Sequence, residues 1–308
     1  MKPEQKEIFI DKIGALDIKV PLLQFGSGDP KILILNGIHG DEISGLFVIK
    51  KLISDLQLKQ GQLDIITSAN PLAQALQERK TPIDKKDLNR NFDPVDSSLT
   101  EQTAEKLLEK FQNYDLVIDL HTFENCSPIV CIFINHGKEK IKQESKRQIE
   151  NFAPELVWEL DIDSKADKDF LGSLGPKLSH QDIANFVVEM PEHFRITDNQ
   201  IQNVNNGIKN VLFDLNMIEN SSNKKRKENL EFFERTRIKA EDSGIFTPEK
   251  ELMSNITSGD KIGEITMVDT FETKPVIAEQ EGKLIIINEK DLVMPGDLLF
   301  SLGEKVTR

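Results

Sequence analysis

An imidazole and a carboxylate stand close together in the segment Asn36–Glu42, which reads NGIHGDE. If a strand runs into a helix here, His39 and Glu42 can reach the same ion, and the glycines let the backbone turn tightly between them. Catalytic zinc sites take three protein ligands of histidine and carboxylate type and leave the fourth position for water. The same pair also arises by chance, with Glu42 merely complementing a helix dipole. A metal site therefore requires a third ligand elsewhere in the chain.

That third ligand is expected at the carboxyl end of a neighbouring strand, where open α/β sheets form their ligand crevice. His121 stands there, directly after the apolar run Asp115–Leu120 (DLVIDL). Asp119 shares a face of that strand with His121 and is placed to hydrogen-bond its imidazole. The remaining histidines lie in loop-like or polar surroundings and are interpreted as surface residues, although His193 is close enough to Glu189 to act as a substitute ligand. They are His136, His180 and His193.

A second polar segment, Asp87–Phe92 (DLNRNF), contains an arginine. The planar guanidinium of Arg90 can bind a carboxylate through two parallel hydrogen bonds, which would make it a clamp for a substrate. The alternative is a turn with an asparagine cap and a surface ion pair, because Asn and Asp are common in turns. This segment alone favours the turn.

Glu189 ends the apolar run Phe186–Val188, where a core strand is expected to meet the edge of the crevice. A glutamate near a zinc-bound water can take its proton and pass it to a leaving nitrogen. The alternative is a glutamate at a strand end that points into solvent. The run itself does not distinguish the two.

Strands that alternate with helices must position these side chains. Lys31–Asn36 is an apolar run that ends at a glycine-rich turn, and Asp41–Leu56 has apolar residues at helical spacing, with two acidic residues expected in its first turn. This alternation predicts an α/β domain with a largely parallel sheet. The other strands expected are Leu63–Ser68, Asp115–Leu120, Ile129–Ile134 and Asn185–Glu189, and the other helices expected are Thr100–Phe111 and Ile201–Leu215.

A polar run at Asn220–Asn229 marks the predicted domain boundary, with a catalytic domain over residues 1–228 and a β-rich domain over 229–308. In the second part, Ser243–Ile265 and Glu281–Leu302 form a weak internal repeat, each half with a Gly-Asp turn. Such halves resemble the sandwich-like barrel of lipoyl and biotinyl carrier domains. Lys274 falls between the halves, where those carriers present a modifiable lysine, but Phe-Glu-Thr-Lys-Pro is not their motif.

The composition restricts the class of partner. The 308-residue chain has a net charge of −13 and a pI near 5.0, which argues against nucleic acid because phosphate binding needs a clustered basic surface. The basic run Lys224–Lys227 is interpreted as part of a solvated linker. Two cysteines, Cys126 and Cys131, cannot form a disulfide framework, and the start of the chain is too charged for a signal peptide. No apolar run approaches the ~20 residues that a membrane-spanning helix needs. A cytoplasmic protein is expected, with homo-oligomerisation left open.

Together these segments resemble the succinylglutamate desuccinylase/aspartoacylase family, relatives of the zinc carboxypeptidases. Asn36–Glu42 is similar to the family's N-G-x-H-G-x-E metal motif, and Arg79–Arg90 is similar to its R…D-L-N-R segment. Asp119–His121 is similar to its D-L-H, and Phe186–Glu189 to the strand that carries its catalytic glutamate. The chain beyond residue 229 resembles its β-rich C-terminal module.

The resemblance implies a zinc-carboxypeptidase-like sheet and zinc-dependent removal of an acyl group from an amino acid or a similar small amide. Glu189 would be the general base and acid. The implied ligands of a single zinc ion are His39, Glu42 and His121. The implied substrate contacts are Asn89 and Arg90 on the carboxylate and Arg79 on the substrate or the oxyanion.

The chain also departs from the family pattern. Met190-Pro191 follows the catalytic glutamate where the family has glycine, and Asp93-Pro94 replaces Pro-Gly. The chain's single tyrosine, Tyr114, begins the strand that ends at His121 and is too far away to supply the active-site tyrosine of carboxypeptidases and aspartoacylase. The substrate therefore stays open.

Two alternatives to the deacylase remain. The first is a zinc carboxypeptidase or peptide amidase that cleaves a C-terminal peptide bond. A C-terminal module that narrows the cleft would argue against this alternative. The second is a non-enzymatic binding or carrier protein on the same fold, for which a modified Lys274 would be the sign. No function is predicted for the helix-rich stretch Glu139–Glu159.

Overall fold

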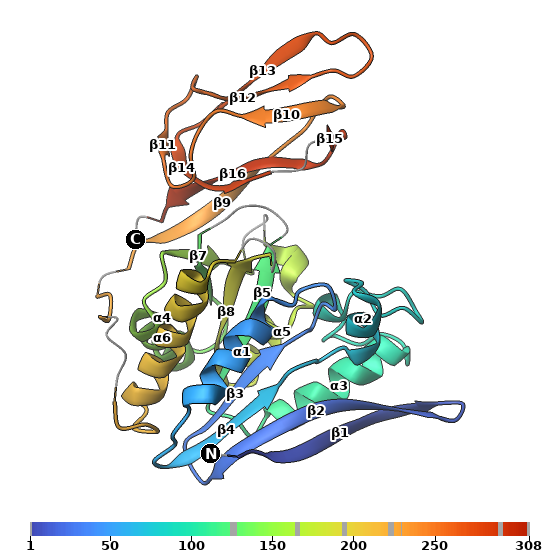
Figure 1. The fold of residues 1–308 in the computed structure, drawn as a ribbon, viewed down its shortest axis with the longest axis vertical. Helices are drawn as coiled ribbons and strands as arrows, with labels where there is room; N and C mark the ends of the chain where they lie inside the picture. Colours follow the sequence, from blue (N-terminus) through green and yellow to red (C-terminus); the bar gives the residue numbers. More distant parts are fainter. Residues whose placement is uncertain are drawn as a thin grey trace.

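The computed structural model describes residues 2–123, 128–163, 167–192, 196–220, 225–228, 230–288 and 292–306. Within these ranges twelve strands form one large sheet and four form a smaller one. Figure 1 shows that helices flank the part of the large sheet built from the first three quarters of the chain, and that the last quarter, from Phe232 on, is β-structure at one end of the molecule.

The middle of the large sheet consists of four parallel strands in the order β4-β3-β5-β8. Nearly all their residues are buried, which is the reason that these segments are almost continuously apolar. The predicted α/β fold with a largely parallel sheet is therefore confirmed. The four strands are β3 (Lys31–Asn36), β4 (Gly61–Ile66), β5 (Leu116–Phe123) and β8 (Ala184–Pro191).

The helices form two layers, one on each face of this sheet. Apolar residues of α1, α4 and α6 share one hydrophobic core with the strands, and those of α3 and α5 share another. No helix in the described ranges is both long and apolar enough to cross a lipid bilayer. The helices are α1 (Ser44–Asp55), α2 (Pro71–Leu76), α3 (Leu99–Phe111), α4 (Glu139–Phe152), α5 (Leu174–His180) and α6 (Asp198–Asp214), with short 3₁₀ helices at Leu88–Arg90 and Lys168–Phe170.

Two predicted boundaries beside the candidate ligands are wrong. The helix expected from Asp41 begins only at Ser44, because Glu42 is turned away from the helix axis to contact the two histidines of the site. The strand expected to end at Leu120 continues through His121 as far as Phe123, because β8 pairs with it along that whole length. His121 is therefore held inside a strand.

The flanks of the sheet contain strands that the sequence patterns did not predict. A long antiparallel hairpin forms one edge, and its strands alternate charged and apolar residues, as an edge strand exposed on one face does. The stretch 139–159 is the helix α4 followed by most of β7. The strands that were not predicted are β1 (Glu4–Ile13), β2 (Leu16–Ser27) and β7 (Leu156–Leu160), whereas β6 (Val130–Ile134) confirms the strand expected at Ile129–Ile134.

The C-terminal strands extend the same large sheet. Strand β9 (Phe232–Lys239) pairs in parallel with β7 and antiparallel with β16, so it joins the two parts of the molecule (Figure 1). The β-rich character of this region is confirmed, whereas the boundary at residue 228 stays a prediction. The remaining strands are β10 (Gly244–Pro248), β11 (Asn255–Ile256), β12 (Lys261–Thr266), β13 (Thr273–Ile277), β14 (Gly282–Ile287), β15 (Leu292–Val293) and β16 (Leu298–Lys305).

The weak internal repeat has a structural counterpart in two equivalent turns. Gly259 and Gly296 both have a φ near +90°, a conformation that favours glycine, at +91° and +94°. The aspartate after each glycine accepts a hydrogen bond from a backbone N–H three residues earlier, at 2.9 Å in both halves. Lys274, however, lies within β13 and its Nζ is 2.8 Å from Asp242, so it is not presented in the turn between β12 and β13.

Candidate metal centre and active-site pocket

The loop between β3 and α1 brings His39 and Glu42 together. Gly37 has a φ of +76°, which turns the chain away from β3. Gly40 packs against the backbone of α2, so closely that a Cβ there would lie 2.0 Å from the carbonyl carbon of Ala73. The two glycines therefore serve different purposes. Gly37 allows the tight turn that was expected, and Gly40 allows the loop to approach α2 closely.

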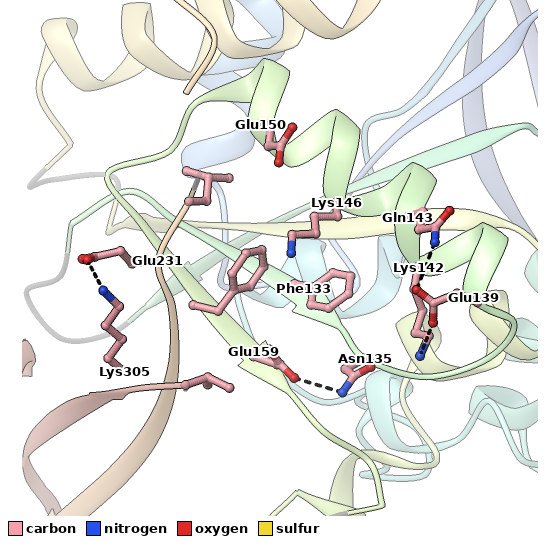
Figure 2. A pocket seen from close by; sticks show the side chains of 13 residues that line it. Phe133, Asn135, Glu139, Lys142, Gln143, Lys146, Glu150, Glu159, Glu231 and Lys305 are labelled. Atoms are coloured by element: carbon pink, nitrogen blue, oxygen red, sulfur yellow. Dashed lines mark hydrogen bonds and ion pairs between the residues drawn. The ribbon is translucent and has the colours of Figure 1, made fainter. Parts of the chain in front are cut away.

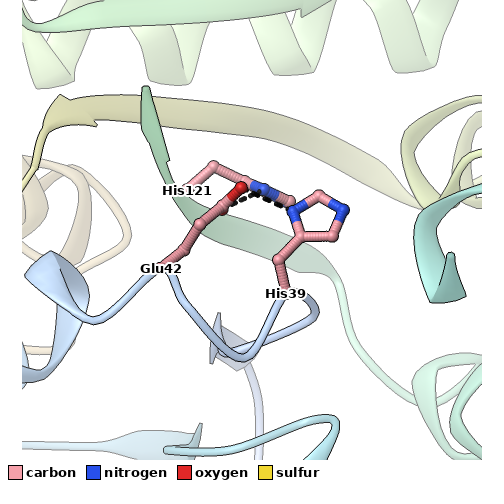
Figure 3. A group of neighbouring side chains, drawn as sticks. All are labelled: His39, Glu42 and His121. Atoms are coloured by element: carbon pink, nitrogen blue, oxygen red, sulfur yellow. Dashed lines mark hydrogen bonds and ion pairs between the residues drawn. The ribbon is translucent and has the colours of Figure 1, made fainter. Parts of the chain in front are cut away.

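Glu42 lies between the two histidines, and the three side chains converge on one point (Figure 3). Its two carboxylate oxygens are 2.6 Å from Nδ1 of His39 and 2.8 Å from Nδ1 of His121. The imidazole rings meet edge to face with their centroids 5.0 Å apart, and all three residues are buried. One ligand atom from each of the three residues lies within 4.8 Å of the other two. Two imidazole nitrogens and a carboxylate oxygen this close together are a set of donors that can bind a zinc ion.

The opposite nitrogen of each ring faces a second carboxylate. Nε2 of His121 is 2.9 Å from Asp119, as expected from the sequence, and Nε2 of His39 is 3.1 Å from Asp87. A carboxylate behind a liganding histidine fixes the ring and directs the other nitrogen towards the metal. The contact of Asp87 with His39 was not predicted, because nothing in the D-L-N-R pattern shows which side chain faces the histidine.

The charges of this cluster also fit a cation. Burial would lower the pKa of His121, but the carboxylates of Asp119 and Glu42 raise it well above its ordinary value. Burial would likewise raise the pKa of Glu42, yet the two imidazoles hold it below its usual range. When the two rings are neutral, the carboxylates of Glu42, Asp87 and Asp119 carry three negative charges, and the paired guanidinium of Arg79 balances one of them. A divalent cation between the donors balances the other two.

Glu189 lies opposite His121 in the parallel pairing of β8 with β5. Its Oε2 is buried and has no hydrogen-bond partner among the described residues. This burial, aided by the negative charge of Glu42 and opposed by His121, raises the pKa of Glu189 to about 7. A carboxyl group with a pKa near neutrality can both accept and donate a proton, as general acid–base catalysis requires.

A pocket of about 440 Å³ opens over this cluster. It is lined by Glu42, His121 and Glu189 and by the three residues expected to contact substrate, while His39 lies buried behind them. The structure thus brings together the predicted site residues from five separate segments of the chain. Those three expected contacts are Arg79, Asn89 and Arg90.

The three residues expected to contact substrate differ in the interactions that they already make within the protein. Arg79 donates to Glu42 and to Asp87, both at 3.2 Å, so it braces the cluster as well as lining the pocket. Asn89 accepts a hydrogen bond from the backbone of Leu174 at the start of α5. Arg90 donates to the hydroxyl of Ser173 and lies over a phenylalanine ring, with no carboxylate partner among the described residues.

Comparison with known proteins decides the family. The model of the succinylglutamate desuccinylase/aspartoacylase catalytic domain matches residues 28–215, more than half of the chain. The chain belongs to the succinylglutamate desuccinylase/aspartoacylase family. The family predicted from the four motifs is confirmed.

The individual relatives of this family member share a third or less of their aligned residues with it. An N-alpha-acetyl-L-2,4-diaminobutyric acid deacetylase from Halomonas elongata is 32% identical over 162 residues, which is 50% of this chain and 46% of that protein. An aspartoacylase family protein from Mesorhizobium loti superposes with a TM-score of 0.81 at 21% identity, covering 100% of this chain and 96% of its own. The product-bound ectoine utilization protein EutE (DoeB) from Ruegeria pomeroyi gives 0.79 at 21% identity, over 93% and 89% of the two chains. At these identities the two structures show a shared fold.

The family's catalytic model ends before β9, yet β9 contributes to the pocket in this family member. Arg235 and Arg237 of β9 line it, and so do Trp158 and Phe170. Sequence reasoning missed all four. The alternation Phe-Phe-Glu-Arg-Thr-Arg from Phe232 was available as a signal for a strand with both arginines on one face, but it did not indicate that this strand joins β7.

Several residues named in the sequence analysis lie away from the pocket or outside the described residues. His193 and Cys126 lie outside the ranges that the structure describes. Tyr114 is buried and donates a 2.5 Å hydrogen bond to Asp64, so it is absent from the pocket lining, as predicted. Met190, which stands where the family has glycine, is fully buried in the core beside β5 and does not line the pocket.

A second cavity, of about 480 Å³, lies on the outer side of β6 and β7 next to α4 (Figure 2). Two ion pairs lie among its lining residues, Lys305 with Glu231 at 2.6 Å and Lys142 with Glu139 at 2.9 Å. It contains none of the predicted site residues. The chemistry of the chain is therefore assigned to the pocket over the histidines.

Proposed function

We propose that this protein is a zinc-dependent hydrolase that removes the acyl group from an N-acyl amino acid or a related small amide. The observation that carries the proposal is the position of Glu189 opposite His121, inside a pocket whose floor is a buried His-Glu-His group. Membership of the family supports the same activity. Deacetylation by the Halomonas relative supports an amide substrate, although only half of this chain aligns with that enzyme.

In this proposal His39, Glu42 and His121 hold the zinc, and Asp87 and Asp119 orient the two imidazoles. Zinc, when bound, polarises a carbonyl and lowers the pKa of a bound water. The convergence of the three donors and the negative charge of the surrounding carboxylates support this assignment.

Glu189 takes a proton from the attacking water at Oε2 and delivers it to the amide nitrogen that leaves. Burial of that oxygen without a partner and a pKa near neutrality support both steps. The balance is that of amide hydrolysis, in which the C–N bond breaks, a C–O bond forms, and the products are a carboxylic acid and an amine.

Arg90 and Asn89 bind the carboxylate of the amino acid, and Arg79 contacts the substrate or the oxyanion. Arg90 has no carboxylate partner among the described residues, so its guanidinium is available to a ligand. Arg79 is bonded to Glu42 and Asp87 but remains half-exposed towards the pocket. Because β9 covers one side of the pocket, a small amide is favoured over a long peptide as substrate.

The proposal is tested by assaying the zinc-loaded protein against N-acyl amino acids and short peptides, before and after removal of the metal with a chelator. We expect hydrolysis of acyl amino acids that is lost with the metal and restored by zinc. Hydrolysis of the peptides alone would indicate a carboxypeptidase. An absence of all hydrolysis by zinc-loaded protein would contradict the proposed function.

A further inference from the structure

An apolar row of side chains lies beside Glu189 on the same face of the sheet. Strand β6 runs antiparallel to β8, so that Val130 stands opposite Glu189 and Ile132 stands opposite Val187. Strand β7 continues the second pair, because Trp158 stands opposite Ile132. Directly opposite side chains point to the same face, and so do side chains two residues apart along a strand. The apolar row Val187, Ile132 and Trp158 therefore lies roughly 7 Å from the row that contains Glu189, the length of two residues in a strand.

The hydrophobic cluster around this row is open to the pocket at its edge. Five apolar side chains pack against the cluster while staying only partly buried, and four of them line the pocket that contains Glu189. Ile134 and Leu160, which stand opposite each other further along β6 and β7, line the same pocket. Among the described residues, the pocket thus has one apolar wall. The four partly buried side chains of this wall are Phe123, Phe170, Val187 and Leu298.

The base closest to the apolar row faces both a ring and acidic groups. The guanidinium carbon of Arg235 lies 3.7 Å from the centroid of the Trp158 ring, and an aromatic face positions such a group. Burial and then Arg237 lower the pKa of Arg235 to about 9, whereas Glu189 and Asp167 favour its charged form. The positive charge of Arg235 is therefore directed towards the ring and two carboxyl groups of the protein.

The other bases of the pocket lie at the border of the apolar wall. Arg90 lies over a phenylalanine ring, and burial lowers its pKa most, while Asp87 and Asp169 oppose that effect. Arg237 and Lys239 are exposed on β9 and also line the pocket. The bases thus border the wall together with acids, and the apolar row itself contains no ionisable side chain.

An open apolar wall beside the reacting atoms favours a ligand that covers it, because covering removes apolar surface of both partners from water. An acetyl group has only one methyl carbon beyond the reacting carbonyl, whereas the apolar row lies roughly 7 Å from the row of Glu189. A longer apolar group is needed to reach it. The position of the wall therefore bears on the size and polarity of the substrate.

Resting on the proposed function, we propose that Val187, Ile132 and Leu298 form a subsite for an apolar group larger than a methyl on the amide substrate. The shared chemistry is an aliphatic or aromatic group, carried either by the acyl chain or by the side chain of the amino acid. Val187 is the residue that determines this specificity, because it is partly exposed in the pocket and lies two residues before Glu189 on the same strand.

Binding can be measured without turnover, because Trp158 is the only tryptophan of the chain and belongs to the apolar row. In zinc-loaded Glu189→Gln protein, its fluorescence is followed during titration with N-acetyl-, N-butanoyl- and N-hexanoyl-L-alanine. A second series, the N-acetyl derivatives of L-alanine, L-norvaline and L-norleucine, tests the side chain of the amino acid. We expect affinity to rise about threefold to fourfold for each buried methylene in one of the two series.

Val187→Thr keeps the β-branched shape but places a hydroxyl on the apolar row, and a hydroxyl buried there without a partner costs free energy. The gain per methylene should fall below about twofold, through KM when hydrolysis is assayed in an otherwise native chain. N-acetyl-L-alanine, which does not reach the apolar row, should bind as before. The series that loses its gain identifies which end of the substrate carries the apolar group.

Val276→Thr is the matched control. It makes the same exchange at a partly buried valine of a strand, β13, outside this pocket. Its gain per methylene should equal that of the protein with Val276 in place.

Three results would overturn the subsite: equal affinities along both series before Val187 is changed, an unaltered gain per methylene in Val187→Thr, or an equal loss of affinity for every ligand in that variant. The last would give Val187 a purely structural role. Failure of the proposed function is distinguishable, because the fluorescence titration reports binding of the apolar group even if no acyl amino acid is hydrolysed.

Discussion

Glu189 on β8 lies directly opposite His121 on β5, in the parallel register that also pairs Leu120 with Val188. Both strands are buried and belong to the centre of the large sheet, so the separation between the proposed base and the proposed ligand is fixed by backbone pairing. Two residues further along β8, the carbonyl of Pro191 accepts a 2.7 Å hydrogen bond from the hydroxyl of Ser44, which ties the start of α1 to the same strand. The proposed metal loop and the base are therefore parts of one rigid unit.

Replacing Glu189 by glutamine should lower kcat by about 10²- to 10⁴-fold while the zinc content stays unchanged, because the amide cannot accept the proton of the water. The matched control is Glu159→Gln, a buried glutamate on β7 that accepts a hydrogen bond from Asn135 outside the pocket. That variant should retain its activity per folded molecule. Steady-state kinetics and metal analysis of both proteins decide the role, and full activity of Glu189→Gln would exclude it as the base.

Asp119→Asn should weaken zinc binding by about 10- to 100-fold, because the amide no longer holds the His121 ring as a carboxylate does. The control on the same chain segment is Asp115→Asn, whose carboxylate accepts a hydrogen bond from the backbone of Lys31 at the opposite end of β5. Competition with a chromophoric chelator measures both affinities. Equal affinities of the two variants would show that Asp119 does not support a ligand.

Gly40→Ala should disrupt the loop that carries His39 and Glu42. The added Cβ would meet the backbone of Ala73 and Gln74 at 2.0 Å and 2.2 Å, and backbone atoms cannot move aside as a flexible side chain does. We expect reduced thermal stability together with weaker zinc binding. Gly14→Ala, in the turn between β1 and β2, strains only a positive φ in open space and should leave zinc binding unaltered. Unimpaired zinc binding by folded Gly40→Ala would contradict the described loop.

Tyr114→Phe should destabilise the fold without impairing catalysis. The phenol donates to the fully buried Asp64, and its loss leaves that carboxylate with only the hydrogen bond from Gln62. The free energy of unfolding should fall by about 1–3 kcal/mol, as measured by urea denaturation. The kcat/KM of the folded enzyme should be unchanged. A large loss of kcat/KM in folded protein would mean that the single tyrosine takes part in catalysis.

The central strands and the family could be predicted because both are recognised from residues that are close together in the sequence. The run Lys31–Asn36 is a strand with the predicted bounds, and His39, Glu42 and His121 lie together as expected. The helix that was expected from Asp41 begins later because Glu42 is held by the two histidines, a contact between distant segments that helical periodicity does not contain.

What could not be predicted depends on the pairing of segments far apart in the sequence. Asp87 reaches His39 across 48 positions of the chain, and β9 joins β7 although more than seventy residues separate Trp158 from Arg235. No local pattern encodes such register, so the arginines of β9 could not be assigned to the pocket from sequence. The cytoplasmic location, the possibility of homo-oligomers and the boundary near residue 228 stay predictions.

The zinc content of the purified protein and of its His121→Ala variant tests the central claim most directly. Elemental analysis should find one zinc ion per chain in the unmodified protein, because His39, Glu42 and His121 supply the three donors of a catalytic site. The variant should lose most of that zinc while remaining folded. An unmodified protein without stoichiometric transition metal, or a variant that retains all of its zinc, would contradict the account.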